Sequence, residues 1–218
     1  MQTEHYDVVI IGGGIHGVGV AQAAAARGYS TLLLEQTGLA SGTSSRSSKL
    51  IHGGLRYLET AQYALVRECL SERALLLKLA PELVKLRPFY IPVYPSTRRR
   101  PWKLRIGLSL YGILAGLGFE NSFNTVSRTS WDTLDGLDTT NLQAVFRYWD
   151  AQTDDAALTK AVMQSALSLG AKLMMPASFI AAELTTTGCV VHYKHSGKDC
   201  TCEAVVLVNA AGPWVNQV

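Results

Sequence analysis

The sequence predicts an α/β fold built around a parallel sheet with a nucleotide-binding turn. Tyr6–Ile11 ends in consecutive β-branched residues, which favour a buried strand. Three glycines follow, and then the Ala-rich stretch Ile15–Arg27, which indicates a helix that Gly28 closes. Thr31–Glu35 is a second apolar run. A strand, a helix and a second strand in this order form a βαβ unit, in which the two strands lie parallel.

The glycines of this unit have the spacing of a dinucleotide-binding turn. Gly12, Gly14 and Gly17 fit the pattern G-x-G-x-x-G. The first glycine of the pattern allows a tight turn, the second lets the backbone approach a pyrophosphate, and the third lets the helix lie close to the strand. Glu35 ends the second strand, where a carboxylate accepts hydrogen bonds from ribose hydroxyls. The pattern suits FAD and NAD equally, and a glycine-rich turn without a ligand is the alternative.

Composition, net charge and cysteine count exclude several classes of protein. Of the 218 residues, 48% are hydrophobic and 17% are charged, which excludes an intrinsically disordered chain. The net charge of +3 does not indicate nucleic acid as a partner. Four scattered cysteines are too few for a disulfide scaffold, and the polar start differs from a signal peptide, so we expect a cytoplasmic setting. Cys200-x-Cys202 lacks a second pair of ligands, so we expect no metal site.

The stretch Ser41–Glu59 has the composition of a segment that lies beneath a flat ligand. It mixes small hydroxyl residues and glycines with cations and apolar residues, namely Arg46, Lys49, Arg56, Leu50, Ile51, Leu55 and Tyr57. A flexible polar loop would explain the serines and glycines but not the apolar residues among them. A small, polar and partly buried backbone suits the face of a large planar group.

This stretch resembles the motif that follows the second strand in FAD-dependent glycerol-3-phosphate dehydrogenases, Ser-Ser-x-Ser-[ST]-Lys-Leu-[IV]-His-Gly-Gly-[LI]-Arg-Tyr-Leu. Three further stretches are similar to segments of the same family: Arg105–Tyr111, Phe146–Asp155 and Val208–Val215. The resemblance extends over the chain from Tyr6 onward. The chain departs from the family at His16, where asparagine is usual, and at Ala157, where arginine is usual.

The resemblance implies a Rossmann-like FAD-binding domain of the glutathione-reductase/D-amino-acid-oxidase type, with part of a second substrate or cap domain. Residues 1–80 and 146–218 would form the FAD-binding domain, and residues 81–145 a partial substrate segment. The implied reaction transfers a hydride from C2 of sn-glycerol 3-phosphate to N5 of FAD and yields dihydroxyacetone phosphate. The electrons then pass to a quinone, or to oxygen in related oxidases.

The resemblance also implies roles for individual residues. Arg56 would hold the substrate phosphate, for which a planar guanidinium is suited, and Tyr57 would border the substrate pocket. His52 is a candidate catalytic base, and positioning of the flavin is the role that we favour for it. A surface arginine and a turn-capping histidine are the alternatives. The residues expected to contact FAD are Gly12, Gly14, Ile15, His16, Gly17, Glu35, Gln36, Thr43, Ser44, Ser45, Ser47, Lys49, Leu50, His52, Gly53, Ala210 and Gly212.

The middle of the chain concentrates positive charge. Between Leu83 and Phe119 there are seven cations and no acid, although the whole chain carries only +3. Trp102–Phe119 is largely apolar and follows three arginines. It is too short to span a membrane, which takes about 20 apolar residues. A basic, apolar helix can instead lie on an anionic membrane surface. A buried helix and a solvated basic loop are the alternatives.

We therefore expect FAD, glycerol 3-phosphate and a quinone as partners. Attachment to the inner face of the cell membrane and a homodimer stay open. We also expect the chain to be the N-terminal portion of a longer enzyme, with impaired activity by itself, because the family has further substrate-domain segments after this point. An amine or amino-acid oxidase on the same fold, with Arg56 holding a carboxylate, is one alternative. An FAD-binding fragment without turnover is another.

Hydrophobic patterning predicts the remaining elements. We expect helices over Tyr63–Leu79 and Ala156–Leu169, an edge strand over Phe89–Tyr94, and strands over Leu173–Met175, Phe179–Leu184, Val190–His195 and Val205–Val208. Pro92 interrupts the Phe89–Tyr94 run, and proline is confined to the edges of sheets because it has no N–H to donate.

Overall fold

A computed structural model describes residues 4–116 and 122–218. The chain divides into two compact units. The first unit joins Met1–Ser48 to Asp154–Val218, and the second unit is Lys49–Thr153. Along the sequence, the second unit is therefore an insertion into the first.

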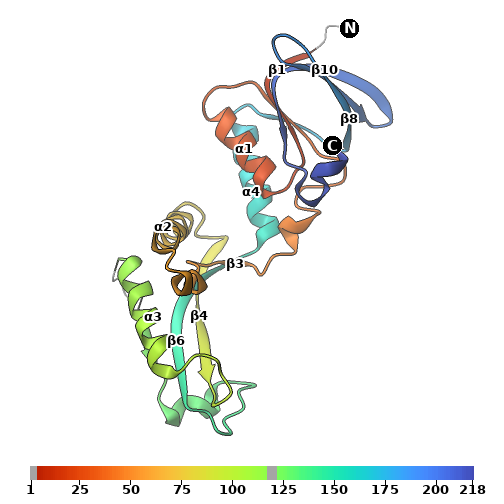
Figure 1. Cartoon of the computed structure of the whole chain (residues 1–218). Coiled ribbons are helices and arrows are strands. Elements are labelled where there is room, and N and C mark those ends of the chain that lie inside the picture. Colours follow the sequence, from red (N-terminus) through yellow and green to blue (C-terminus); the bar gives the residue numbers. More distant parts are fainter. Residues whose placement is uncertain (1–3, 117–121) are drawn as a thin grey trace. The chain divides into compact units, whose positions relative to one another are not determined.

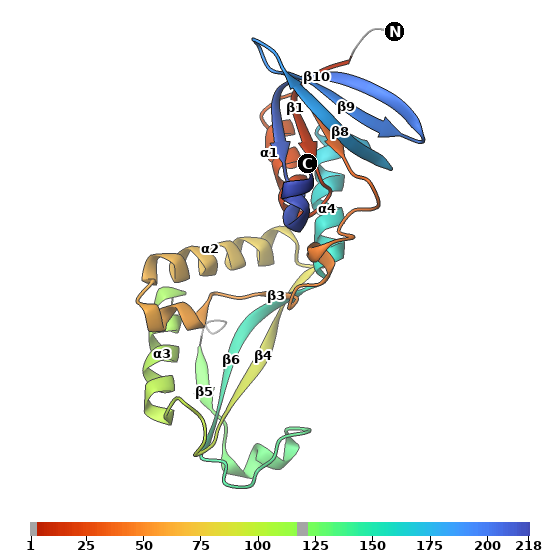
Figure 2. The same cartoon turned by 45° about the vertical axis from the view of Figure 1, so that its right-hand side comes forward.

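The first unit contains a mixed sheet with the strand order β7-β2-β1-β10-β9-β8 (Figure 1). Strands β7, β2, β1 and β10 run parallel, and β10, β9 and β8 form an antiparallel meander (Figure 2). The strands are β1 (Glu4–Ile11), β2 (Thr31–Leu34), β7 (Lys172–Met174), β8 (Ala177–Leu184), β9 (Cys189–His195) and β10 (Lys198–Asn209). The predicted α/β fold with a parallel βαβ unit is confirmed.

Helices α1 (Ile15–Ala25) and α4 (Asp155–Ser168) pack together in the first unit (Figure 2). Helix α1 connects β1 to β2, and Asp154 begins α4 by accepting the N–H of Ala157 at 3.0 Å. Because side chains alternate along a strand, Ile10 contributes to the cluster under the helices and Val9 to a second cluster. The helix-side cluster includes Ile10, Val18, Ala21, Leu33, Met163 and Ala166.

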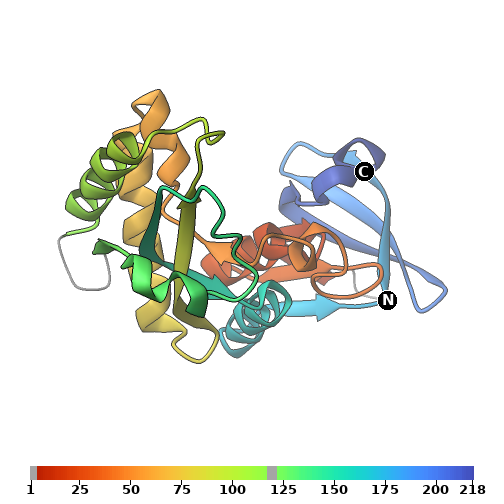
Figure 3. The ribbon, with the colours of Figure 1, turned by 90° about the horizontal axis from the view of Figure 1, so that it is seen from below.

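The second unit is built on an antiparallel sheet with β6 at its centre. Strand β4 pairs with one edge of β6, and β3 and β5 pair with successive parts of the other edge. Helices α2 and α3 lie on one face of this sheet (Figure 2, Figure 3). The elements are β3 (Leu50–Ile51), α2 (Tyr63–Leu79), β4 (Val84–Val93), α3 (Pro101–Leu114), β5 (Phe123–Thr125) and β6 (Ala144–Thr153).

Short 3₁₀ helices connect several of these elements. They are Thr43–Ser45 and Gly212–Gln217 in the first unit and Leu55–Thr60 and Arg128–Thr133 in the second. None of the helices in the described part of the chain is both long and apolar enough to cross a membrane.

Several predicted elements have shifted ends. Helix α2 has the predicted bounds, and β4 lies at a sheet edge as predicted. Strand β4 begins at Val84 instead of Phe89, because its whole length pairs with β6. Strand β10 begins at Lys198 instead of Val205, because β1 and β9 flank it and override the weak strand propensity of its polar first half. The apolar run Trp102–Phe119, for which a helix and a basic loop were both open, is helical up to Leu114, and residues 117–119 lie outside the described residues.

The two units divide the chain after Ser48 and after Thr153, whereas the sequence-based boundaries are residues 80 and 145. Two contacts explain the difference. Helix α2 packs against α3 through Val66, Leu70 and Tyr111, so it belongs to the second unit. Strand β6 pairs with β4 along its length, which keeps residues 146–153 in that unit as well.

The packing of α1 on β1 makes a testable prediction. A Cβ on Gly17 would lie 1.9 Å from the carbonyl oxygen of Gly12, whereas a Cβ on Gly19 would meet nothing within 4 Å. We expect Gly17→Ala to lower the free energy of unfolding by about 1–3 kcal/mol or more, because the added methyl group overpacks the contact. Gly19→Ala, on the same helix, should stabilise by up to about 1 kcal/mol. Urea unfolding of both variants measures this, and equal stabilities would contradict the close approach.

Candidate functional site

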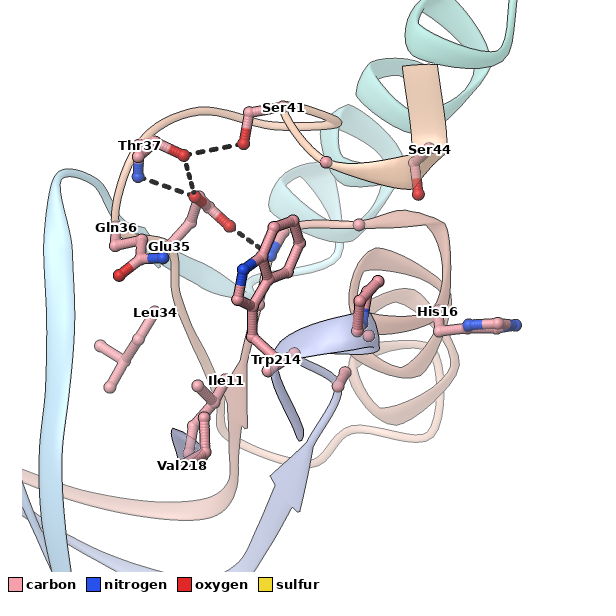
Figure 4. Close-up of a pocket in the computed structure, with 18 of the residues that line it drawn as sticks. Ile11, His16, Leu34, Glu35, Gln36, Thr37, Ser41, Ser44, Trp214 and Val218 are labelled. Carbon is pink, nitrogen blue, oxygen red and sulfur yellow. Dashed lines mark hydrogen bonds between the residues drawn. The ribbon is translucent and has the colours of Figure 1, made fainter. Parts of the chain in front are cut away.

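A cavity of about 470 Å³ lies in the first unit at the carboxyl ends of β1 and β2 and the start of α1 (Figure 4). This edge of a parallel sheet is where α/β proteins bind nucleotides. The lining includes many of the residues predicted to contact FAD, namely Gly12, Gly14, Ile15, His16, Glu35, Gln36, Thr43, Ser44, Ala210 and Gly212. These predicted residues therefore lie around one cavity.

The glycine-rich turn leaves no room for side chains on the side of β10. Gly12 has a φ of +108°, and a Cβ there would lie 2.7 Å from the carbonyl oxygen of Ala210. Gly17 lies beneath the turn, against Gly12 and Ala210, and does not line the cavity. This close approach brings the start of α1 directly to the end of β1.

The N-terminus of α1 faces the cavity with its backbone N–H groups. Gly14 is the N-cap residue and provides no side chain, and the first turn has no acidic residue. The hydroxyl Oγ of Ser44 accepts the N–H of Ile15 at 2.9 Å. The partial positive charge at a helix N-terminus attracts phosphate, so this end of α1 suits an anionic ligand.

Glu35 is 7% exposed and organises one wall of the cavity (Figure 4). Its Oε2 accepts the N–H of Gly13 at 2.7 Å. Its Oε1 accepts the N–H and the hydroxyl of Thr37 at 2.7 and 2.9 Å, and the N–H of Gly38 at 3.1 Å. Three donors surround Oε1 and one donor reaches Oε2, so Oε2 is the oxygen with room for a ligand hydroxyl.

Sequence reasoning missed several residues of this cavity. Trp214 lines it, and a Cβ on Gly42 would lie 2.9 Å from the Trp214 ring. Thr37 and Ser41 also line it, and their hydroxyls are 2.7 Å apart. Trp214 stands in a stretch already noted as similar to the family, which is the signal that could have found it.

Two of the predicted serines have other contacts and do not line the cavity. The N–H and hydroxyl of Ser47 donate to Oδ2 of Asp155 at 3.1 and 2.7 Å. The hydroxyl of Ser45 donates to the carbonyl oxygen of Gly42 at 3.2 Å. The Ser47 bonds hold the loop before residue 49 against the first turn of α4, and the Ser45 bond lies within the loop.

The second unit contains the remaining predicted residues, which are Lys49, Leu50, His52, Gly53, Arg56 and Tyr57. Gly54 has a φ of +71° and begins the 3₁₀ helix Leu55–Thr60. A Cβ on Gly54 would lie 2.4 Å from the ring of Tyr57, so the left-handed backbone and the packed ring both require glycine there. The side chains of His52 and Arg56 are exposed at this turn, and Gly53 is buried.

The tautomer of His52 follows from one hydrogen bond. The N–H of Gly54 donates to Nδ1 of His52 at 3.1 Å. Nδ1 is therefore the acceptor of a neutral imidazole, and its proton lies on Nε2. In this arrangement His52 can donate a hydrogen bond from Nε2, while the N–H of Gly54 occupies Nδ1.

Arg56 is exposed, and no carboxylate in the described part of the chain forms an ion pair with it. Nearby, Glu59 pairs with Arg99, whose Nη2 lies 2.8 Å from Glu59 Oε2. Arg56 is thus available to an anionic ligand.

The cysteines show no sign of metal or disulfide chemistry. All four are free thiols. Among the residues that the structure describes, no three His, Cys, Asp or Glu side chains gather in a way that could hold a metal ion. Burial raises the pKa of the Cys202 thiol to about 11, which keeps it protonated and unreactive.

Comparison with known proteins identifies relatives along the whole chain. The chain is 42% identical over 214 residues to a glycerol-3-phosphate dehydrogenase of Pseudomonas aeruginosa, covering 98% of this chain and 41% of that protein. It is 39% identical over 220 residues to a D-erythritol 1-phosphate dehydrogenase of Brucella abortus, covering 100% of this chain and 43% of that protein. The chain thus spans less than half the length of these curated relatives.

Solved structures and a family model agree with the sequence comparison. A glycerol-3-phosphate dehydrogenase of Bacillus halodurans, solved with FAD, superposes with a TM-score of 0.73 at 28% identity, over 98% of this chain and 35% of that chain. A glycine oxidase of Geobacillus kaustophilus shares the fold with a TM-score of 0.74 at 22% identity, over 98% of this chain and 57% of that chain. The expected FAD-binding fold is confirmed. Residues 7–218 match the model of the FAD dependent oxidoreductases, and the chain belongs to this family.

Proposed function

We propose that the first unit binds the adenosine diphosphate half of FAD in the cavity at the start of α1. The observation that supports this most is the joint position of three groups: the side-chain-free turn at Gly12, the α1 N-terminus, and Oε2 of Glu35. The pyrophosphate would approach the turn and the N–H groups of α1, and Glu35 would accept a ribose hydroxyl. The same carboxylate would repel a 2′-phosphate, which disfavours NADP.

We propose that the whole protein oxidises sn-glycerol 3-phosphate to dihydroxyacetone phosphate. The support is the similarity to proteins named glycerol-3-phosphate dehydrogenase, together with the exposed Arg56. FAD, when bound, supplies the acceptor for the hydride that leaves C2 of the substrate. Arg56 would hold the substrate phosphate with a planar pair of N–H donors, and Tyr57 would border the same pocket.

The proposed role of His52 follows from its tautomer. With the proton on Nε2, its ring can orient an oxygen of the flavin or the substrate by donating a hydrogen bond. Acting as the base for the C2 hydroxyl would require the bond between Gly54 and Nδ1 to break. We therefore propose positioning as its main role.

A second candidate substrate is D-erythritol 1-phosphate. The observation that favours it is the 39% identity to the Brucella abortus protein of that name. Both compounds are phosphorylated polyols, so Arg56 would serve either one. For an amino-acid oxidase activity, the support is only the fold that this chain shares with a glycine oxidase. Comparing kcat/KM for the two phosphates and for glycine in the whole protein separates these substrates.

We propose that helix α3 lies on an anionic membrane surface, where a quinone would accept the electrons. Trp102, Ile106 and Ile113 are 60%, 59% and 58% exposed. With 3.6 residues per turn, these positions fall on one side of the helix. Lys103 and Arg105 are also exposed and flank this apolar stripe with positive charge. Such a helix binds anionic lipid through both its apolar and its basic side chains.

Replacement of Glu35 tests the cofactor site. Glu35→Gln places an amide NH₂ against an N–H donor in either orientation. We expect at least about a tenfold loss of FAD affinity, in line with the cost of an unsatisfied buried group. Quenching of FAD fluorescence on binding measures the affinity, and exposed Glu82→Gln is the matched control. Equal affinities for the two variants would refute the proposed role of Glu35.

Replacement of Arg56 tests the phosphate site in the whole enzyme. Arg56→Ala should raise KM for glycerol 3-phosphate by about 10–100-fold, because a charge-assisted bidentate contact is lost. KM for unphosphorylated glycerol should change little. Exposed Arg46→Ala controls for the loss of one positive charge. Equal effects on both substrates would argue against phosphate binding by Arg56.

Binding to lipid vesicles tests whether helix α3 lies on an anionic membrane. Replacing Trp102, Ile106 and Ile113 with serine should reduce co-sedimentation with phosphatidylglycerol vesicles at least about tenfold, because their apolar area no longer leaves water. Leu75 and Leu79 of α2 are also exposed, at 46% and 71%, so their replacement with serine is the control. A similar loss for both sets would show that helix α3 has no special part in binding.

A further inference from the structure

A chain of buried polar groups lies beneath the turn that contains His52. The N–H of Gly53 donates to the hydroxyl of Tyr111 at 2.9 Å, and this hydroxyl donates to Oδ2 of Asp150 at 3.3 Å. Nη1 of Arg73 donates to Oδ1 of the same carboxylate at 3.0 Å. Tyr111, Arg73 and Asp150 are 2%, 2% and 3% exposed. They come from α3, α2 and β6, so three elements of the second unit meet under Gly53.

The turn rests directly on this network. A Cβ on Gly53 would lie 2.3 Å from the Tyr111 hydroxyl and 2.4 Å from Leu70. Gly53 therefore has no freedom to move toward α2 and α3. The register of β3 on β6 pairs Ile51 with Ala151, so the chain passes Asp150 as it enters the turn.

A contribution to stability does not by itself explain why the ion pair between Arg73 and Asp150 is buried. Burial raises the pKa of the Asp150 carboxyl above its ordinary value, and Arg73 opposes that rise. Removing two charges from water costs about as much as their attraction returns, so apolar residues of similar volume would hold the core as well. What apolar residues cannot supply is an acceptor in a fixed place for the Gly53 N–H. Arg73 also donates to the carbonyl oxygen of Trp149 at 3.2 Å, which holds the guanidinium against β6.

We propose that Tyr111 is a positioning residue for the segment His52–Tyr57, with Asp150 and Arg73 fixing the direction of its hydroxyl. The inference rests on the proposed function, because this segment has the side chains that would meet flavin and substrate. Tyr111 touches neither ligand. It acts through the backbone of Gly53, and thereby on His52 on one side and on Arg56 on the other.

Tyr111→Phe keeps the ring and removes the acceptor of the Gly53 N–H. Tyr148→Phe is the matched control: its ring packs edge-on against Tyr111 at 6.3 Å, and among the described residues its hydroxyl forms no hydrogen bond. Thermal unfolding first establishes that both variants are folded. We expect amide exchange over residues 52–57 to be at least about tenfold faster in Tyr111→Phe, as for a lost hydrogen bond, and unchanged in Tyr148→Phe.

Two measurements on the whole protein with FAD complete the test. For Tyr111→Phe we expect a shifted absorption band of the bound flavin and a rise in KM for glycerol 3-phosphate of at least about fivefold, with a smaller change in kcat. Faster exchange with an unchanged flavin band and an unchanged KM would reduce Tyr111 to a structural residue and overturn the proposal. Equal changes in the flavin band and in KM for Tyr111→Phe and Tyr148→Phe would also overturn the proposal.

The test separates this proposal from the proposed function. If the wild-type protein does not oxidise glycerol 3-phosphate, the proposed function fails. The exchange of residues 52–57 and the flavin band still decide the role of Tyr111 in that case, because neither measurement depends on the substrate. An unchanged flavin band would then overturn the positioning role.

Discussion

Helix α1 lies so close to strand β1 that no side chain fits between them at Gly17. A Cβ there would stand 1.9 Å from the carbonyl oxygen of Gly12. This approach places the N–H groups of the first turn of α1 at the carboxyl end of the parallel strands. Ala210, which follows strand β10, reaches the same point, and its backbone fills the space that a side chain on Gly12 would need. The cavity and the proposed phosphate site at the start of α1 both depend on this contact.

Features set by short stretches of sequence were predictable, and features set by folded loops were not. The βαβ unit and the glycine spacing follow from local pattern, since each residue acts within its own turn or strand. The bonds from Glu35 to Gly13 and Thr37 depend on a loop conformation that no spacing rule describes. The same holds for the bond from Ser47 to Asp155, a residue far away in the sequence.

The arginines of the second unit show why burial was hard to predict. Arg56 is exposed at a turn, and Arg73 is 2% exposed inside α2. In the sequence both stand among apolar and charged neighbours, and a helical arginine is usually solvated. Its partners on β6, the Asp150 carboxylate and the carbonyl oxygen of Trp149, help to explain why Arg73 is buried, and tertiary structure brings them near. A resemblance to a family identified the exposed arginine, whereas the buried one had no recognisable pattern.

Because the chain is synthesised from its N-terminus, all of the second unit is made before the last strands of the first unit. Strand β1 lies between two parallel partners, β2 and β10, and the pairing of Ile11 with Asn209 of β10 spans nearly the whole chain. During synthesis, β1 can pair with β2 early but with β10 only after residue 198 is made, while β3, β4, β5 and β6 can complete their antiparallel sheet within Lys49–Thr153. Non-local parallel pairing is also slow to form. Of the two units, we therefore expect the first to complete its sheet after the second, although it begins the chain.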